Sequence, residues 1–326
     1  MAGREEIAEQ ILGRLRQSRR VLISTHEHPD GDALGSVLAI YHALRIQGKE
    51  AVVYLPDPAP DFFGYMPGFE ELTTEKPNVE EFDTVVLLDY TQLYRTHIED
   101  EARIHPNTIC IDHHYDNKGE AKINLIIPEA AATAQIVAEV FRFGGVSITQ
   151  DIATCLLTGI FTDTGSFMHD STSPEILILA SDLMRKGARL AHIAHETYQK
   201  KDLPALRIWG KALSRVMVNE RTGASVSVIT YSDLQECGAT RDDLAGVVNM
   251  LNTLPQTKYS LLLTEYEPGK IKGSLRSEPH KNVDVSKIAQ KLGGGGHKLA
   301  SGFEVDGKIV QKDGKWRIEN NVTSNS

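Results

Sequence analysis

The chain has 326 residues, of which 41% are hydrophobic, and its 35 basic and 44 acidic side chains give a formal net charge of −9. This length suits two medium domains, each with a core of its own. A chain of net negative charge repels a long nucleic acid duplex, so any nucleic acid substrate is expected to be short or held locally.

The cysteines Cys110, Cys155 and Cys237 are widely spaced and odd in number, which argues against a disulfide framework and favours a reducing compartment. The N-terminus lacks the apolar core of a signal peptide, and no apolar run approaches the roughly 20 residues of a membrane span. We therefore expect a cytoplasmic globular protein that does not enter a membrane.

Apolar residues at helical spacing over 6–16 precede a short run of β-forming residues at 21–24. The following segments predict a helix over 33–48 that closes at Gly48, strands at 51–55, 84–89 and 108–112, and helices at 133–143, 151–161 and 174–186. Strands that are continuous apolar runs between helices are typical of a parallel sheet covered on both faces. The predicted fold class is therefore α/β, with a mostly parallel sheet flanked by helices.

From about 190 the pattern is continuously helical and then changes. It next predicts a strand at 224–232, a helix at 243–254, strands at 259–267 and 270–277, a helix at 284–292, and a last strand after the glycine-rich stretch at 292–302. We predict a first domain over 1–190, a helical connector over 191–217, and a smaller α/β domain over 218–326 that ends in a polar tail, NNVTSNS.

Aspartate and histidine side chains follow three predicted strands, and one further aspartate follows a predicted helix. They are His26, Asp30, Asp32, Asp89, Asp112, His113 and His114, with Asp163 after the helix. The carboxyl ends of parallel strands form one edge of a sheet, where ligands bind, so these side chains should converge. Unpaired carboxylates that lie together raise one another's pKa, and burying them is costly. Divalent cations relieve this repulsion, so the set predicts a metal site.

Each of these residues also has a structural alternative. An aspartate after a strand, such as Asp30 or Asp32, is often only a helix N-cap, and a single histidine near a strand end is more often at the surface or in the core. Two motifs on separate strands of one sheet, HxxPDxD and DHH, favour the metal site instead. His28 is the exception, and we expect it at the surface.

The ligand types indicate the metal. Mixed carboxylate and imidazole ligands without a nearby thiol favour Mn²⁺, with Mg²⁺, Co²⁺ or Fe²⁺ as alternatives, over a structural zinc site. The set is too large for one ion. Two ions about 3.5 to 4 Å apart, bridged by a carboxylate, commonly activate water and clamp a phosphoryl group. Asp89 is the natural bridge because it stands alone on a middle strand.

The second domain contains four consecutive glycines and a histidine, Gly293 to His297. Such a run can be a flexible hinge. The amides of Gly294, Gly295 and Gly296 can also cradle an anion, with His297 and Arg276 as charge-assisted donors. The stretch from Lys258 to Lys298 contains eight basic and four acidic residues, which gives it a net charge of +4 within a chain of net charge −9. This stretch therefore predicts a clamp for a short, phosphate-bearing substrate.

The motifs together resemble a known family. The stretch HEHPDGDALGS at 26–36, Asp89, DHH at 112–114 and Asp163 resemble the four motifs of the DHH phosphoesterases. The stretches GSLRS at 273–277 and GGGGHKLASG at 293–302 resemble the DHHA1 domain that accompanies them. The resemblance covers nearly the whole chain, and its length and domain order look like the NrnA-type nanoRNases and pAp phosphatases. It implies a DHH catalytic domain over 1–190 and a DHHA1 substrate-binding domain over 218–326.

The resemblance also implies roles for individual residues. His26 and Asp30 would hold one Mn²⁺, Asp89 would bridge, and the second ion would be held by Asp32, His113 and Asp163. His114 would face the scissile phosphate, and Asp112 would orient the histidines. The substrate would contact Arg276, Gly294, Gly295, Gly296 and His297.

The implied activity is hydrolysis of short RNA oligonucleotides to mononucleotides and removal of the 3′-phosphate of pAp. One alternative is a hydrolase of linear or cyclic dinucleotides such as pApA or cyclic di-AMP. A non-catalytic nucleotide sensor, which loss of metal ligands would favour, is another, and a structural or interaction protein is weaker still. A long-strand exonuclease of the RecJ kind should carry a further nucleic-acid-binding domain and a more basic surface. A homodimer is compatible with the sequence.

Overall fold

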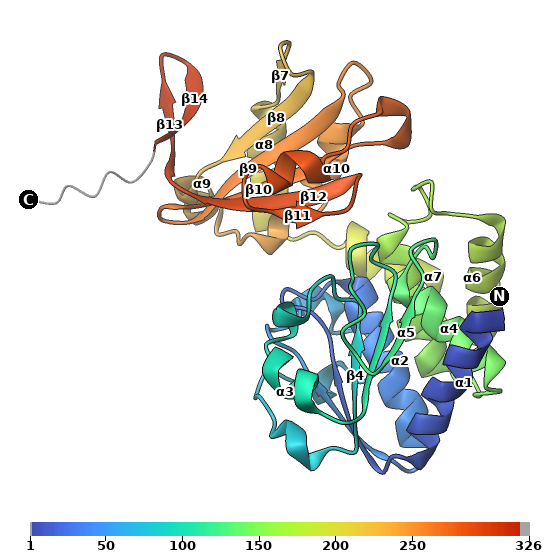
Figure 1. Ribbon diagram of the computed structural model, residues 1–326. Coiled ribbons are helices and arrows are strands. Elements are labelled where there is room, and N and C mark those ends of the chain that lie inside the picture. Colours follow the sequence, from blue (N-terminus) through green and yellow to red (C-terminus); the bar gives the residue numbers. More distant parts are fainter. Residues whose placement is uncertain (1, 320–326) are drawn as a thin grey trace, which may run out of the picture. The chain divides into compact units, whose positions relative to one another are not determined.

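The computed structural model describes residues 2–319 (Figure 1), and the chain divides into two compact units after Gln199. The helices of the first unit are α1 (Ala2–Gln17), α2 (Gly31–Ile46), α3 (Glu99–Ile104), α4 (Thr133–Phe143), α5 (Gln150–Asp163), α6 (Pro174–Arg185), α7 (Leu190–Ala194) and the π-helix η5 (His195–Gln199). Its strands are β1 (Arg20–Ser24), β2 (Glu50–Tyr54), β3 (Leu72–Thr73), β4 (Thr84–Leu88), β5 (Thr108–Asp112) and β6 (Ile123–Ile126). The polar tail predicted at 320–326 lies outside the described residues.

The sheet of the first unit has the order β3-β2-β1-β4-β5-β6, and every pair of neighbouring strands is parallel. The chain runs outward from β1 to β3 and then returns to place β4 beside β1. The connections that leave β1 and β4 therefore diverge in opposite directions, which opens a crevice at their carboxyl ends. The predicted α/β class with a parallel sheet is confirmed.

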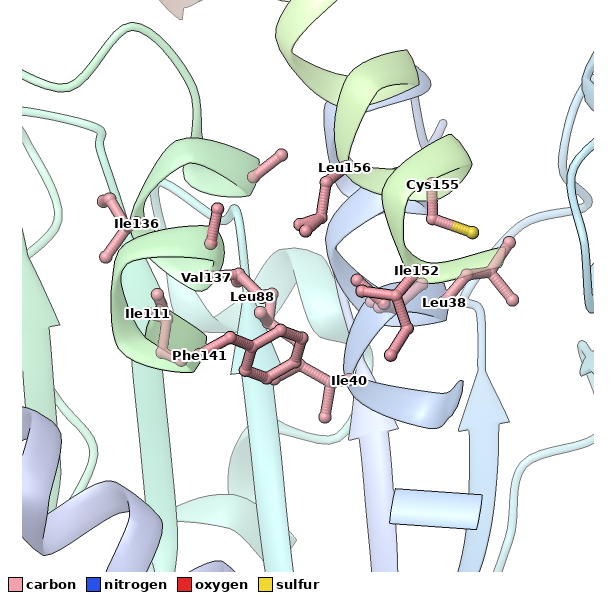
Figure 2. Packing of buried hydrophobic residues seen from close by; sticks show 14 of the residues in the cluster. Leu38, Ile40, Leu88, Ile111, Ile136, Val137, Phe141, Ile152, Cys155 and Leu156 are labelled. Atoms are coloured by element: carbon pink, nitrogen blue, oxygen red, sulfur yellow. The ribbon is translucent and has the colours of Figure 1, made fainter. Parts of the chain in front are cut away.

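Both faces of this sheet are buried, because alternate residues of each strand point to opposite sides. In β4, Val86 and Leu88 join the larger core, and Val85 and Leu87 join a smaller core on the other face. Figure 2 shows the larger core, in which Leu88 lies among apolar side chains of α2, α4 and α5. The continuous apolar strands predicted from the sequence result from this double burial.

Two glycines allow α2 and α5 to pack at close range. A Cβ atom on Gly35 of α2 would lie 2.5 Å from the carbonyl oxygen of Cys155. One on Gly159 of α5 would lie 2.7 Å from the Cβ of Ala134 and 2.8 Å from Oδ1 of Asp32. The two helices run antiparallel, so the start of α2 and the end of α5 meet at the carboxyl edge of the sheet.

The second unit contains the helices α8 (Leu203–Ser214), α9 (Tyr231–Cys237), α10 (Val247–Asn252) and α11 (Ser286–Gln290). Its strands are β7 (Met217–Asn219), β8 (Ala224–Ile229), β9 (Tyr259–Glu267), β10 (Lys270–Arg276), β11 (Gly295–Gly296), β12 (Ala300–Asp306), β13 (Lys308–Lys312) and β14 (Lys315–Glu319). The six strands β11-β12-β10-β9-β8-β7 form a mixed sheet, and β13 and β14 form a separate hairpin. None of the helices described in either unit is long and apolar enough to cross a membrane.

The segment 191–217, expected as a connector, contains elements of both units. Helix α7 and η5 belong to the first unit, and α8 belongs to the second. In α8, Ile208 and Ala212 are buried in the core of the second unit together with Ile229 and Leu234. The proposed three-part division of the chain stays a prediction.

The close packing of α2 and α5 makes Gly159 sensitive to substitution. We expect Gly159→Ala to lower the free energy of unfolding by about 1–3 kcal/mol, because the added methyl group overlaps Ala134 and Asp32. Gly13→Ala in α1 is the matched control, because a Cβ there meets nothing within 4 Å. We expect this control to be neutral or to stabilise by up to about 1 kcal/mol. Urea denaturation measures both, and equal effects would contradict the close-packing account.

Candidate metal centre

The carboxyl edge of the first sheet brings together the acidic and histidine side chains that the sequence singled out. His26 lies in the loop after β1, and Asp89 immediately follows β4. Asp112 is the last residue of β5, with His113 and His114 directly after it. Asp163 is the final residue of α5, not part of the turn that follows it. The two central strands and their neighbour β5 thus supply most of the site.

Asp89 lies in the middle of this arrangement. Ligand atoms of His26, Asp30 and Asp89 all lie within 4.8 Å of one another, and so do those of Asp32, Asp89 and His113. Asp89 is the residue common to both groups. It adopts a left-handed backbone conformation, φ 54°, which is uncommon for a residue other than glycine and turns the chain sharply at the end of β4.

The distances between these groups suit a shared cation. The Oδ2 atom of Asp89 lies 3.7 Å from Nε2 of His26, and its Oδ1 atom lies 3.6 Å from Nε2 of His113. The Nε2 atom of His113 also lies 3.6 Å from Asp163 Oδ2. These separations are too long for hydrogen bonds. Two ligand atoms that share an octahedral ion at about 2.1 Å lie roughly 3.0 to 4.2 Å apart, so the spacing fits an ion between them.

Backbone carbonyl groups orient the two imidazoles. The Nδ1 atom of His26 lies 2.6 Å from the carbonyl oxygen of Glu27, and that of His113 lies 3.3 Å from the carbonyl oxygen of Ala130. A carbonyl oxygen only accepts, so Nδ1 carries the donated proton. The Nε2 atoms then face the carboxylates, which is the usual arrangement of a metal-binding histidine.

Asp30 has a structural role as well as its place near His26. It is the N-cap of α2, and its Oδ1 atom accepts hydrogen bonds from the N–H groups of Asp32 at 3.0 Å and Ala33 at 3.1 Å. The helix-cap alternative is therefore correct for Asp30. The same carboxylate also belongs to the group formed with His26 and Asp89.

Asp32 connects α2 to the start of α4. Its Oδ2 atom accepts from the N–H of Thr133 at 2.6 Å, and its Oδ1 atom accepts from the N–H of Ala134 at 2.9 Å. Helix α4 has no capping side chain of its own at Ala132, so Asp32 caps it from another helix. The Thr133 hydroxyl also donates to Asp89 Oδ1 at 2.9 Å. No sequence pattern identifies Thr133, because a lone threonine at a helix start is common.

Asp112 lies beneath the two histidines and is fully buried. Its Oδ1 atom accepts from the backbone N–H of His113 and from Nδ1 of His114, each at 2.8 Å. Its Oδ2 atom accepts from Asn117 Nδ2 at 2.6 Å. With these bonds Asp112 fixes the orientation of the His114 ring. Asn117, which lies in the loop after the DHH motif, has no sequence signal that we recognised.

Burial and like charge make the carboxylates unequal. Burial raises the pKa of Asp32 well above its usual range, and Asp89 and Asp163 add to the shift. Desolvation, opposed by His113, raises the pKa of Asp163 to about 6. Asp89 differs, because the nearby histidines outweigh its burial and hold its pKa below the usual range. Burial disfavours the charged form of His113, but Asp163, Asp89 and Asp32 raise its pKa to about 9. Without a cation, protons would have to neutralise much of this charge.

His28 lies away from the two ligand groups. It is exposed, and both its backbone N–H and its Nδ1 atom lie 2.9 Å from Asp57 Oδ2. These contacts agree with the surface position expected for this residue.

The glycine run of the second unit is packed within the sheet. Gly295 and Gly296 form β11, which pairs with Gly302 and Ser301 of β12. A Cβ on Gly294 would lie 2.1 Å from the carbonyl oxygen of Gly302. A Cβ on Gly296 would lie 2.7 Å from the carbonyl oxygen of Ala300, so close packing explains Gly294 and Gly296, whereas a Cβ on Gly293 or Gly295 would meet nothing within 4 Å.

The other predicted substrate residues lie at the same end of β10 and β12. Arg276 pairs with Ala300, and Ala300 accepts a hydrogen bond from the N–H of His297 at 2.7 Å across a turn. The Nε atom of Arg276 donates to Oδ1 of Asn249 in α10 at 3.0 Å. The structure thus gathers Arg276, the turn at His297 and the glycine run, and adds Asn249, which the sequence pattern did not identify.

A carboxylate and imidazole cluster at the switch point of a doubly wound sheet is the kind of site at which hydrolytic enzymes bind divalent cations. The model of the DHH family, N-terminal domain, matches residues 20–160, and the model of the DHHA1 domain matches residues 223–317. The chain belongs to the DHH/DHHA1 phosphoesterase family, which confirms the resemblance inferred from its motifs.

Named relatives cover nearly the whole chain. A bifunctional oligoribonuclease and PAP phosphatase NrnA from Thermus thermophilus is 34% identical over 88% of this chain and 84% of the relative. The protein of the same name from Bacillus subtilis is 24% identical over 87% of this chain and 89% of the relative.

Solved structures share the fold. An exopolyphosphatase-related protein from Bacteroides fragilis superposes with a TM-score of 0.84 at 28% identity, covering 92% of this chain and 91% of that one. RecJ from Thermus thermophilus in complex with Mn²⁺ has a TM-score of 0.53 at 13% identity, covering 93% of this chain and 52% of RecJ.

The raised pKa of His113 predicts how stability depends on pH. In metal-free protein, charged His113 contributes stability that is fully present below pH 6.5, the ordinary histidine pKa, and is lost as pH rises towards about 9. A divalent cation must displace this proton, so it should stabilise the fold more at higher pH. We expect the increase in Tm caused by Mn²⁺ or Mg²⁺, relative to EDTA, to grow between about pH 6 and pH 8.5. His28→Ala should show the same increase in Tm as wild type. A Tm that is the same with Mn²⁺, with Mg²⁺ and with EDTA would contradict a metal site.

Proposed function

We propose that this protein is a Mn²⁺-dependent phosphoesterase with two ions, which hydrolyses short RNA oligonucleotides to mononucleotides and removes the 3′-phosphate of pAp. The observation that carries the proposal is Asp89, which is shared by two groups of ligand atoms at the switch point of the sheet. The substrate class is supported by relatives named as oligoribonucleases and PAP phosphatases over most of their length. Mn²⁺ suits the mixed ligand set best, with Mg²⁺ or Co²⁺ as alternatives.

The ligands divide between two ions. His26 and Asp30 would hold one ion, Asp32, His113 and Asp163 would hold the other, and Asp89 would contribute a ligand atom to each. Bound cations of this kind supply Lewis-acid stabilisation of the phosphate and acidify a water molecule. Thr133 donates to Asp89 Oδ1 and restrains the rotation of that carboxylate. The bridge is therefore held before substrate arrives.

We assign to His114 the contact with the scissile phosphate. Its Nδ1–H donates to Asp112, which directs the opposite edge of the ring, with Nε2, towards a phosphate oxygen. Asp112 acts through His114 and is a positioning residue.

The second unit holds the rest of the substrate. Arg276, His297 and the stretch Gly294, Gly295 and Gly296 would contact a phosphate or base away from the scissile bond. The N–H of Gly294 donates to the carbonyl oxygen of Ala289 at 2.9 Å, so the close approach of the glycine backbone, and not this amide, would serve the contact. Oδ1 of Asn249 accepts from Nε of Arg276 at 3.0 Å and the carbonyl oxygen of Leu275 accepts from Nη1 at 2.9 Å, and these two bonds orient the guanidinium. The net negative charge of the chain restricts substrates to short ones. A homodimer is compatible with this arrangement.

The first test compares substrates and two variants. We expect wild type with Mn²⁺ to hydrolyse pAp and RNAs longer than a dinucleotide faster than pApA or cyclic di-AMP, which represent the alternative function. The bond cleaved in pAp belongs to a phosphate monoester, and the bonds cleaved in the other substrates belong to diesters. Asp89→Ala should abolish activity on all of them, because it removes a ligand from both ions. His28→Ala should retain it, since His28 is exposed and its Nδ1 atom lies 2.9 Å from Asp57 Oδ2. Equal losses in the two variants would overturn the bridging role.

The second test separates substrate capture from chemistry. Arg276→Ala should lower kcat/KM for a dinucleotide roughly ten- to a hundred-fold, as expected for loss of a charge-assisted contact. It should have little effect on bis(p-nitrophenyl) phosphate, which has no nucleotide to hold. His297→Ala should have the same effect as Arg276→Ala. Arg276→Lys should restore little of the lost kcat/KM, because lysine lacks the bidentate fork of arginine. Equal loss on both substrates, or loss of bound Mn²⁺, would contradict a capture role.

A further inference from the structure

Strand β10 presents three polar side chains on one face of the second sheet. Lys272, Ser274 and Arg276 occupy alternate positions and are half-buried. In register, Lys272 lies opposite Thr264 on β9, on the same face as Leu262, which is buried against α8 and α10. The helices therefore cover the β8 and β9 side of this face and leave the β10 side partly open.

Lys272 lacks a fixed anionic partner. Its ammonium group makes no hydrogen bond or ion pair with any residue of the described chain, 2–319. Glu304 lies directly opposite on β12, but its carboxylate contacts Arg241 at 3.6 Å and accepts from the Tyr266 hydroxyl at 3.2 Å. A lysine that served only the fold would be expected to pair with this carboxylate.

The charges near Lys272 are of both signs. Burial, Arg241 and Arg276 lower the pKa of Lys272 to about 8, against the attraction of Glu304 and Asp242. Below this pH the charged Lys272 is partly desolvated and forms no ion pair among the described residues, which is unfavourable for the fold. An anionic ligand would remove that cost.

Arg241 is held in place to contribute to such a site. It comes from the loop between α9 and α10, and its guanidinium carbon lies 5.1 Å from the centre of the Tyr266 ring. The ring and Glu304 together fix the orientation of Arg241, and 25% of the surface of its side chain is exposed. Two cations, Arg241 and Lys272, therefore lie near the single carboxylate of Glu304, and Lys272 forms no ion pair with it. The unpaired positive charge is of the kind that a phosphate can neutralise.

We propose that Arg241 and Lys272 form a second phosphate-binding subsite, which takes a backbone phosphate of an oligonucleotide whose other end is held at Arg276. This inference rests on the proposed function. Lys272 and Arg276 are four residues apart on a strand, which separates their Cα atoms by roughly 13 Å. The two phosphates of pAp share one ribose, so pAp cannot occupy both subsites. The subsite therefore favours RNA over pAp.

The test uses two lysines of the same strand. Lys272→Met keeps the length of the side chain and removes its charge. Lys270→Met is the matched control, because Lys270 is exposed and already paired with Asp306 at 2.6 Å. KM is measured with Mn²⁺ for pAp, an RNA dinucleotide and an RNA pentanucleotide.

We expect Lys272→Met to raise KM for the pentanucleotide roughly ten-fold, to leave KM for pAp unchanged, and to keep or raise Tm. The salt dependence of pentanucleotide binding should fall by about 0.7 in logarithmic slope, as for one lost contact to a single strand. Arg241→Gln should show the same dependence on substrate length, and Lys270→Met should change none of these values.

An unchanged KM for the pentanucleotide, or an equal increase for pAp, would overturn the subsite. If wild type hydrolyses neither RNA nor pAp, the proposed function fails by itself. The subsite is then decided by fluorescence anisotropy of a labelled pentanucleotide in EDTA. Binding weakened by Lys272→Met and not by Lys270→Met supports it, and equal binding by all three proteins overturns it.

Discussion

The mutual repulsion of four aspartates at one edge of a parallel sheet is the constraint on which the first unit depends. Asp32 and Asp89 are each only 2% exposed. The fold opposes the repulsion with the partial positive charge of helix N-termini, since Asp30 caps α2 and Asp32 caps α4, and with imidazole groups around Asp89. These hydrogen bonds and imidazoles reduce the cost without removing it, and a bound cation would relieve the unfavourable charge that remains.

The contacts that hold the ligands are also contacts that hold the fold. Asp32 provides the cap that α4 lacks, so the start of that helix and one ligand are stabilised together. The loops after β1 and β4, on the two sides of the switch point, are joined through Glu27 and Arg95. The N–H of Glu27 donates to the carbonyl oxygen of Arg95 at 2.7 Å, and Arg95 Nε donates to Glu27 Oε1 at 3.3 Å. The two hydrogen bonds between Glu27 and Arg95 fix the separation of these loops, and therefore of His26 and Asp89. The bonds that join the two sides of the crevice thus also position the site.

The sequence predicted the parts of the site that repeat a physical pattern. Apolar runs ending in Asp or His identified the strands and the residues that converge at their ends. Thr133, Asn117 and Asn249 were missed because each is a single polar residue whose partner lies on another element, and only tertiary register brings the two together. Element boundaries failed for local reasons: the helix expected at 243–254 begins after Gly246, which has φ 91°, and turns at Gly307 and Gly314 divide the last predicted strand into β12, β13 and β14.

Charge distribution links the two units to one kind of substrate. In the proposed function, the cluster around Asp89 in the first unit acts on the phosphate ester itself. Recognition of the rest of the substrate is proposed for three cations of the second unit, Arg276, Lys272 and Arg241, in a chain whose net charge is −9. Each additional phosphate of a long strand meets this net repulsion, whereas the first few meet Arg276, Lys272 and Arg241. Affinity should therefore rise over the first few nucleotides and then level off. The preference for short RNA would then arise because only these three cations bind phosphates, and not because longer strands are sterically excluded.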